Sequence, residues 1–194
     1  RIALRRGTFW PLASVGLFAV TAWHMLTAYG VMLMGSGRAA IIAFTMPVWA
    51  SLLGALVLKE PLDGRRVAAL ALGMGGMALL IASDVARIGA APLGALLILA
   101  AAVAWAGGIV LTKSFDWRIG TMALTGWQLV IGGLPILVAW PLVEELPELG
   151  AISWRAWGAL GFVTFVALVF CYTAHVQLVR ALPAAMAAMA TLVI

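Results

Sequence analysis

The sequence predicts an all-α membrane protein, a polytopic bundle of transmembrane helices with no sizeable water-soluble domain. Three observations support this fold class: 65% of the 194 residues are apolar, 10% are charged, and long apolar stretches recur along the chain. A soluble domain carries about a quarter charged residues, and its polar side chains could not cover this much apolar surface. The stretches are rich in Ala, Leu and Met and do not alternate with polar residues, which predicts helices rather than strands.

Six stretches are long enough to cross a membrane, since about 20 apolar residues span ~30 Å of hydrocarbon. They are predicted at approximately Phe9–Met34, Ala39–Leu58, Val67–Ser83, Pro92–Thr112, Thr121–Val143 and Trp154–Val179. A partial seventh span begins near Pro183 and is still apolar at Ile194. The charged segment 59–66 and the acidic segment 144–148 separate neighbouring spans, because charged and helix-breaking residues gather there.

The basic residues divide unevenly between the two sides of the membrane. If residues 1–6 are cytoplasmic and the spans alternate, nine Lys and Arg lie inside, and three lie outside, at Arg38, Arg87 and Arg155. The positive-inside rule therefore predicts that residues 1–6 and the 59–66 loop are cytoplasmic. Tryptophans near segment ends are predicted to be anchors at the membrane surface: Trp10, Trp117, Trp140, Trp154 and Trp157.

Composition argues against several other classes of protein. The net charge of +5 would suggest nucleic acid as a partner in a soluble protein, but here the basic residues lie between apolar stretches, as topology signals do. A single cysteine, Cys171, excludes a disulfide framework within the chain. With one Cys and two His, and no carboxylates in the spans, no zinc site can be built. No cofactor, metal ion or catalytic residue is predicted, and the expected partners are membrane lipid and a small-molecule substrate.

Two parts of the chain resemble each other. Tyr29–Pro47 is similar to His175–Val193 at an offset of 146 residues: each has a long helix, a very short turn and a helix rich in small residues. The chain crosses the membrane five times between the copies by the spans predicted above. Because that number is odd, the copies are predicted to lie in opposite orientation, as inverted repeats do in many secondary transporters. Five spans in each repeat would give a protein of ten helices.

The residues of these segments resemble a known family. The run 36–49, SGRAAIIAFTMPVW, followed by Lys59-Glu60-Pro61-Leu62, is similar to the third and fourth helices of an EamA repeat, which defines much of the drug/metabolite transporter superfamily. Residues 182–194 are similar to the matching part of the second repeat. The resemblance implies that residues 1–88 are the last three helices of the first repeat and 89–194 the first part of the second. It also implies two helices before Arg1, a ninth helix that continues past Ile194, and a tenth.

Polar residues in the middle of a span are candidate functional residues, because placing them in lipid is energetically unfavourable. Trp23, His24 and Thr27 are predicted to share one face of the first span and to line a substrate cavity; the alternative is a helix–helix contact made by a neutral His24. The full set of predicted substrate-binding residues is Trp23, His24, Thr27, Thr45, Trp49, Trp127, Gln128, Tyr172 and His175.

Two prolines within spans predict kinks. Pro47 and Pro135 each remove one backbone hydrogen bond, and the freed carbonyls must be met by hydroxyls such as Thr45 or by water. Such a kink either bends during gating or is static, and both possibilities stay open. Glu60 is predicted to be an ion-pair partner of Arg65 or Arg66 in a loop rather than a proton carrier.

The leading prediction is a secondary transporter of small organic solutes that works by alternating access. By the family resemblance it is expected to be an inner-membrane exporter of amino acids or related metabolites. The absence of Asp and Glu from the middle of the predicted spans favours facilitated diffusion or exchange over proton coupling. The alternatives are a membrane pore or structural membrane subunit, and an intramembrane enzyme, for which the sequence shows no catalytic motif.

Overall fold

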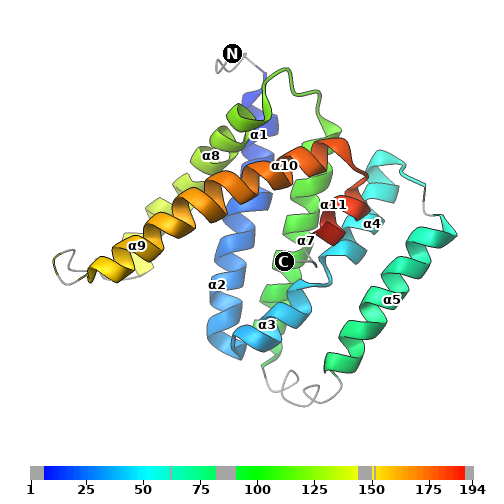
Figure 1. Ribbon diagram of the computed structural model, residues 1–194, viewed down its shortest axis with the longest axis horizontal. Coiled ribbons are helices and arrows are strands. Elements are labelled where there is room, and N and C mark those ends of the chain that lie inside the picture. The colour runs from blue at the N-terminus through cyan, green and yellow to red at the C-terminus, as the bar shows by residue number, and fades with distance from the viewer. Residues whose placement is uncertain (1–6, 62, 82–90, 144–149, 151, 191–194) are drawn as a thin grey trace.

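The computed structural model describes residues 7–61, 63–81, 91–143, 150 and 152–190, and its regular elements in these ranges are helices (Figure 1). The α-helices are α1 Phe9–Gly16, α2 Trp23–Met34, α3 Ser36–Ala43, α4 Met46–Leu58, α5 Gly64–Ile81, α7 Pro92–Ser114, α8 Thr121–Val143, α9 Trp154–Phe162, α10 Tyr172–Ala181 and α11 Ala184–Met189. Two wider π-helical segments, η1 Leu17–Ala22 and η3 Val163–Cys171, join α1 to α2 and α9 to α10.

Five of the predicted spans are confirmed. The segments long and apolar enough to cross a membrane are Phe9–Met34, Ser36–Leu58, Pro92–Ser114, Thr121–Val143 and Trp154–Ala181. The third predicted span corresponds to α5, whose described apolar part, Val67–Gly76, is shorter than a full span. Its predicted end at Ser83 lies outside the described residues, as do residues 1–6, the repeat boundary at 88/89, the acidic segment 144–148 and residues 191–194 of the seventh span.

The second span consists of two helices rather than one. α3 ends at Ala43 and α4 begins at Met46, so the break falls just before Pro47. In the first turn of α4 the missing N–H of Pro47 removes no hydrogen bond within that helix. The hydroxyl of Thr45 donates a hydrogen bond of 2.7 Å to the carbonyl of Ile42 at the break. The predicted kink therefore takes the form of a helix interruption, which Pro47 follows.

The central helix of the bundle is α7, which packs against α1, η1, α2, α3, α4, α10 and α11. Its buried surface is made largely of small residues: Ala101, Ala102, Ala104, Ala106 and Gly108. A Cβ atom added to Gly108 would lie only 2.6 Å from the Cβ of Ala19, so the backbones of α7 and η1 are in close approach there. Without a hydrophobic force between helices in lipid, such close packing of small residues is what holds a membrane bundle together.

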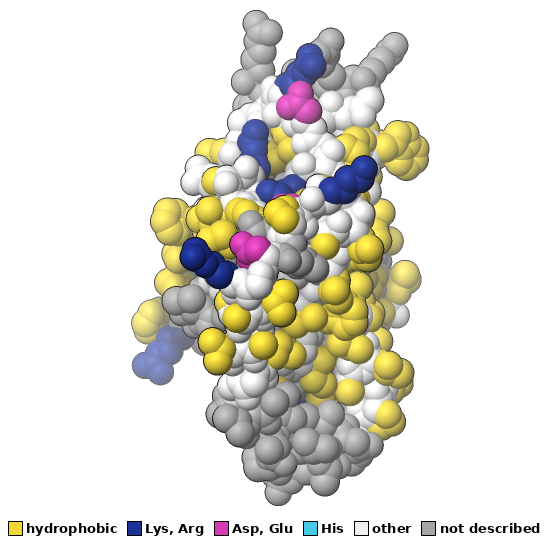
Figure 2. All heavy atoms as spheres, turned by 90° about the vertical axis from the view of Figure 1, so that its right-hand side faces the viewer, with side chains coloured by type: hydrophobic (Ala, Val, Ile, Leu, Met, Phe, Trp, Pro, Cys, Tyr) yellow, Lys and Arg dark blue, Asp and Glu magenta, His cyan; other side chains and the backbone are white. Residues whose placement is uncertain are grey.

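The outer surface is apolar, as lipid contact requires. Large side chains such as Leu56, Leu72 and Leu142 are more than three-quarters exposed. In the view of Figure 2, most of the charged side chains lie in the upper half of the molecule, and hydrophobic side chains cover much of the described surface below them. Exposing this much apolar surface to water would be energetically unfavourable, whereas lipid acyl chains can cover it without a free-energy penalty.

The tryptophans at segment ends are mostly exposed, as expected of surface anchors, but Trp117 is not. Trp10, Trp140, Trp154 and Trp157 are exposed, whereas Trp117 is only 7% exposed and its Nε1 donates to the carbonyl of Thr112 at 2.6 Å. Trp117 thus satisfies a carbonyl at the end of α7, one of those that have no partner within the helix. The prediction that Trp117 is an interfacial anchor was wrong, because the chain turns back there and buries the ring.

Candidate functional site

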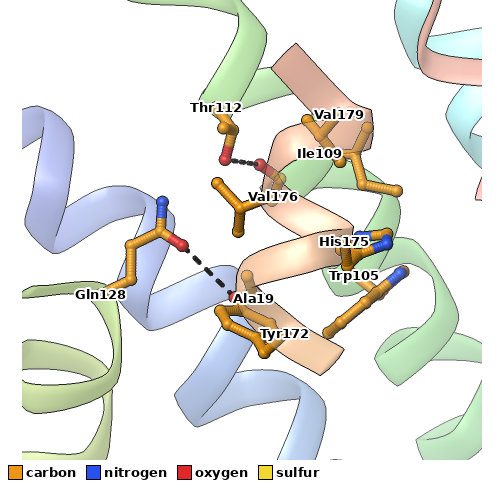
Figure 3. Close-up of a pocket in the computed structure, with 10 residues that line it drawn as sticks. Ala19, Trp105, Ile109, Thr112, Gln128, Tyr172, His175, Val176 and Val179 are labelled. Carbon is orange, nitrogen blue, oxygen red and sulfur yellow. Dashed lines mark hydrogen bonds between the residues drawn. The ribbon is translucent and has the colours of Figure 1, made fainter. Parts of the chain in front are cut away.

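Four aromatic and imidazole rings meet where α2, α7 and α10 come together, and we call them the aromatic cluster: Trp23, Trp105, Tyr172 and His175. The centre of the Trp105 ring lies 5.2 Å from that of Trp23, 5.1 Å from that of His175 and 6.0 Å from that of Tyr172. Figure 3 shows Trp105 and His175 side by side, with Tyr172 next along α10. α7 thus supplies the ring that joins the first span to the sixth.

A buried amide from α8 contacts this cluster. Gln128 has no exposed surface, and its Oε1 accepts a hydrogen bond of 3.4 Å from the hydroxyl of Tyr172 (Figure 3). The amide nitrogen of Gln128 has no partner among the described residues, and neither has the indole nitrogen of Trp105 or the hydroxyl of Thr125. Buried polar atoms usually find a partner, and leaving one unpaired costs roughly 1–3 kcal/mol. The centre of the bundle therefore presents donors that a polar molecule could satisfy.

The space beside the cluster is small in this structure. A cavity of about 10 Å³ lies between Gln128, Tyr172, His175 and the facing part of α7. That volume holds about one water molecule and no organic solute. The aromatic cluster is therefore closed here, and any solute that reached it would have to separate the rings first.

A second, much larger space lies beside α2. It is a groove of about 470 Å³ between α2 and the second half of α8, and we call it the α2–α8 groove. Its walls are His24, Met25, Ala28, Tyr29 and Met32 from α2, and Ile136, Ala139, Trp140 and Val143 from α8. Small-molecule sites usually measure about 300–1,000 Å³ and combine apolar walls with a few polar groups. Here the polar groups are His24, Tyr29 and Trp140.

The packing of α8 explains where the groove begins. α8 packs tightly on α1 and η1, where a Cβ added to Gly132 would lie 2.5 Å from the carbonyl oxygen of Gly16. The hydroxyl of Thr21 donates a hydrogen bond of 2.5 Å to the carbonyl of Gly132 in the same contact. Pro135 follows inside α8 and offers no N–H to the preceding turn. Beyond Pro135, α8 forms one wall of the groove and α2 forms the other.

Local geometry fixes how His24 faces this groove. Its Nδ1 lies 2.7 Å from the carbonyl oxygen of Val20 in the preceding helical turn. A carbonyl can only accept, so Nδ1 carries the hydrogen, and in the neutral ring Nε2 is then an acceptor. The groove therefore offers an acceptor at His24 and donors at Tyr29 and Trp140.

The structure separates residues that were predicted to share a face. Trp23 packs on Trp105, whereas His24 lines the α2–α8 groove. The hydroxyl of Thr27 is buried and has no partner among the described residues. The prediction of one cavity-lining face with all three side chains is corrected, because neighbouring positions on a helix point about 100° apart.

The other predicted site residues divide between the cluster and two separate places. Tyr172, His175 and Gln128 meet at the aromatic cluster, as described above. Thr45 and Trp49 lie at the break between α3 and α4, where the indole nitrogen of Trp49 donates to the hydroxyl of Thr45 at 3.2 Å. Trp127 packs against the buried core around Leu12 and Val15.

Sequence reasoning missed the ring at the centre of the cluster and most of the groove. Trp105 had a usable signal, because it lies mid-span while most other tryptophans lie near span ends. Met25 and Tyr29 were not among the predicted substrate-binding residues, yet both line the groove with His24. Trp140 was read only as an anchor. The walls of a groove between two helices cannot be found from either helix alone.

Comparison with known proteins identifies the family to which this chain is related. The sequence profile of the EamA-like transporter family matches residues 1–82 and 92–194. The chain is 31% identical to Protein PecM of Dickeya dadantii over 149 residues, covering 76% of this chain and 50% of that protein. It is 30% identical to the uncharacterized transporter YvbV of Bacillus subtilis over 154 residues, covering 79% of this chain and 49% of the other.

A further relative has a name that refers to substrates. Over 109 residues the chain is 33% identical to a probable amino-acid metabolite efflux pump of Escherichia coli, covering 55% of this chain and 36% of that protein. The chain spans about half the length of the first curated relatives it matches. No solved structure shows a significant match to it.

The family match extends over nearly the whole chain. The long apolar helices of the structure and the transporter names of the relatives are consistent with this family. The predicted family resemblance is thereby confirmed. The chain belongs to the EamA-like transporter family, within which these helices, the aromatic cluster and the α2–α8 groove have to be understood.

Proposed function

We propose that this chain forms part of a secondary transporter that moves small organic solutes, such as amino acids or related metabolites, across the inner membrane by alternating access. The observation that carries the proposal is a pair of spaces within the bundle, one open and one closed. One is an open groove of a size that admits a small molecule, and the other is a closed cluster with unpaired donors. A carrier needs one accessible site and one closed barrier in each of its states.

The orientation predicted from the basic residues gives these spaces a direction. The groove is formed by the ends of α2 and α8 that lead into segments predicted to be outside. The Lys59–Glu60 loop, Lys113 and Arg180 lie toward the predicted cytoplasmic side. The described state is then open to the outside and closed to the cytoplasm. An exporter would release its solute from such a state.

The lining of the groove favours amphipathic solutes. Its walls are apolar, with polar groups from three side chains, and no side chain in the wall carries a fixed charge. A solute with a flat or aliphatic body and one or two hydrogen-bonding groups fits this chemistry. This agrees with metabolites of the kind named for the Escherichia coli relative.

The test is flux in proteoliposomes, with the protein that carries this chain and a labelled panel of amino acids and related metabolites. Saturable flux that is accelerated by unlabelled solute on the opposite side supports an alternating-access carrier. Flux that does not saturate points to a pore. Absence of flux for every solute, from protein shown to be folded and inserted, would contradict the proposal for this panel.

A further inference from the structure

One carboxylate joins the ends of helices from the two halves of the chain. Both oxygens of Glu60, in the loop after α4, accept from the backbone N–H of Ala184 at the start of α11, at 3.2 and 3.0 Å. The Nζ of Lys113, at the end of α7, lies 3.6 Å from the Oε1 of Glu60. The same Nζ donates to the carbonyl of Leu182, between α10 and α11, at 2.6 Å. We call these four residues the Glu60 clasp.

The partner of Glu60 differs from the predicted one. The sequence suggested Arg65 or Arg66 in the same loop, whereas the structure pairs Glu60 with Lys113, which is 53 positions further along. A loop partner would have stabilised the loop alone. A partner on α7 makes the pair a link between α4 and the helices α7, α10 and α11.

The clasp is shielded from solvent. The side chains of Lys113 and Glu60 are 18% and 19% exposed. Charges removed from water attract each other more strongly, but separating them without new partners is expensive. Lys113 also donates to backbone carbonyls at the C-terminal end of α10. The last carbonyl groups of a helix have no hydrogen-bond partners within that helix. The contacts therefore break or form together.

The packing beneath the clasp is equally close. A Cβ added to Gly54 on α4 would lie 3.2 Å from the Cβ of Ala184 and 3.6 Å from the Oε2 of Glu60. Gly54 and Ala184 are both buried. Nothing larger than the backbone fits between α4 and α11 at this point, so no solute can pass between them while the clasp is formed.

The clasp lies at the last turn of α7, whereas the α2–α8 groove extends along α2 toward the start of α7. Near its start, Gly94 is packed against Leu33 and Met34, at the end of α2 that borders the groove. Lys113 lies at the other end of the same helix, about 28 Å away by the 1.5 Å rise per residue. The open end and the clasped end of the bundle are therefore joined by the helix at its centre.

We propose that the Glu60 clasp is the gate on the cytoplasmic side: it is formed while the groove is open to the outside, and it must separate before solute can enter from or leave to the cytoplasm. This inference rests on the transport function proposed above. It assigns Glu60 and Lys113 a role in changing state rather than in binding solute, since neither lines the groove.

A reversible crosslink across the clasp tests this directly. In a Cys171→Ser background, Gly54→Cys and Ala184→Cys place two thiols where the Cβ atoms of a disulfide, about 3.8 Å apart, can be accommodated with a small shift. Oxidation should form the bond, detected by mass spectrometry of peptides. Counterflow should then fall in proportion to the fraction crosslinked and return after reduction, while each single-cysteine variant shows no response to oxidant.

The outcomes separate this inference from the proposed function. Normal counterflow in fully crosslinked protein would overturn the gate and leave the transporter intact. Failure of the thiols to crosslink would contradict the contact itself and overturn the gate as well. Absence of counterflow in the reduced parent protein counts against the proposed function instead, and the gate is then judged by labelling alone.

The labelling experiment needs no transport. Ile109 is buried one helical turn before Lys113 and lines the closed cavity, so Ile109→Cys reports whether the clasped end opens. Its reaction with a membrane-impermeant thiol reagent, applied from the cytoplasmic side to the Cys171→Ser background, should be slow. Glu60→Gln should speed it about tenfold, because charge-assisted hydrogen bonds contribute that much or more to an equilibrium. Glu60→Asp, which keeps the charge, is the matched control. Equal rates in the Glu60→Gln and parent proteins would overturn the gate.

Discussion

Trp23 and His24 are neighbours on α2, yet they face two different spaces. The Trp23 ring lies 5.2 Å from that of Trp105 in the closed aromatic cluster, and His24 forms part of the wall of the α2–α8 groove. α2 is therefore the partition between the open and closed spaces of this bundle. A small rotation of α2 about its axis would move both side chains at once, which links access at the groove to closure at the cluster.

The first prediction concerns the acceptor in the groove. Replacing His24 with Ala should lower flux roughly five- to tenfold, because one hydrogen bond to the solute is lost. The amount of protein inserted in the membrane should not change. The measurement is the initial rate of counterflow per inserted protein. Leu56→Ala, on the exposed face of α4, is a control that should transport normally. Normal flux in His24→Ala would assign His24 a structural role.

The second prediction compares two adjacent glycines on α8. Gly132→Ala should lower stability by about 1–3 kcal/mol, because its Cβ would meet the backbone of Gly16 and the side chain of Val20. Gly133→Ala should be neutral or stabilising by up to about 1 kcal/mol, because nothing lies within 4 Å of its Cβ and Ala is the better helix former. Thermal unfolding in detergent measures both. Equal effects would mean that α1 and α8 are not in contact.

The third prediction concerns the buried amide at the cluster. The double variant Gln128→Leu with Tyr172→Phe removes both partners of the 3.4 Å hydrogen bond and the unpaired amide nitrogen together. It should be at least as stable as the parent, whereas each single variant leaves a polar atom unpaired and should lose about 1–3 kcal/mol. Flux should nevertheless fall about tenfold or more, since a site built to bind a polar group is weakened strongly when its donors go.

A double-mutant cycle decides how this third result is understood. Stability of the four proteins in detergent and counterflow of each give two independent measures. If the double variant is less stable than either single variant, the amide is a structural residue. Unchanged flux in a stable double variant would remove Gln128 and Tyr172 from the solute pathway.

The fourth prediction concerns the break between α3 and α4. Pro47→Ala restores an N–H at residue 47, which can then bond the carbonyl of Ala43 and join the two helices into one. Proline costs about 3 kcal/mol inside a helix, so its removal makes the joined form much more accessible. If the break moves during transport, the maximal rate should fall several-fold while the solute concentration at half-saturation changes little. An unchanged maximal rate would show that the break is static.

The sequence by itself determined the class of fold and the limits of most helices. The ends of the first and fifth spans, Phe9–Met34 and Thr121–Val143, agree with the structure, because the free energy of burying apolar residues in lipid depends on composition along one segment. The missing N–H of Pro47 likewise predicted a kink at this position, where the structure has the break between α3 and α4. Nothing about neighbouring helices is needed for these inferences.

Only the tertiary structure decided which side chains meet. Trp105 became the centre of a cluster because α7 lies in the middle of the bundle, and Glu60 found Lys113 instead of a neighbour in its own loop. His24 and Trp23 were separated by the rotation of one helix relative to its neighbours. These outcomes depend on the close approach of small residues such as Gly108 and Gly132, where an excess methyl group would shift a whole helix. That sum of contacts is spread over several helices, so no single stretch of sequence contains it.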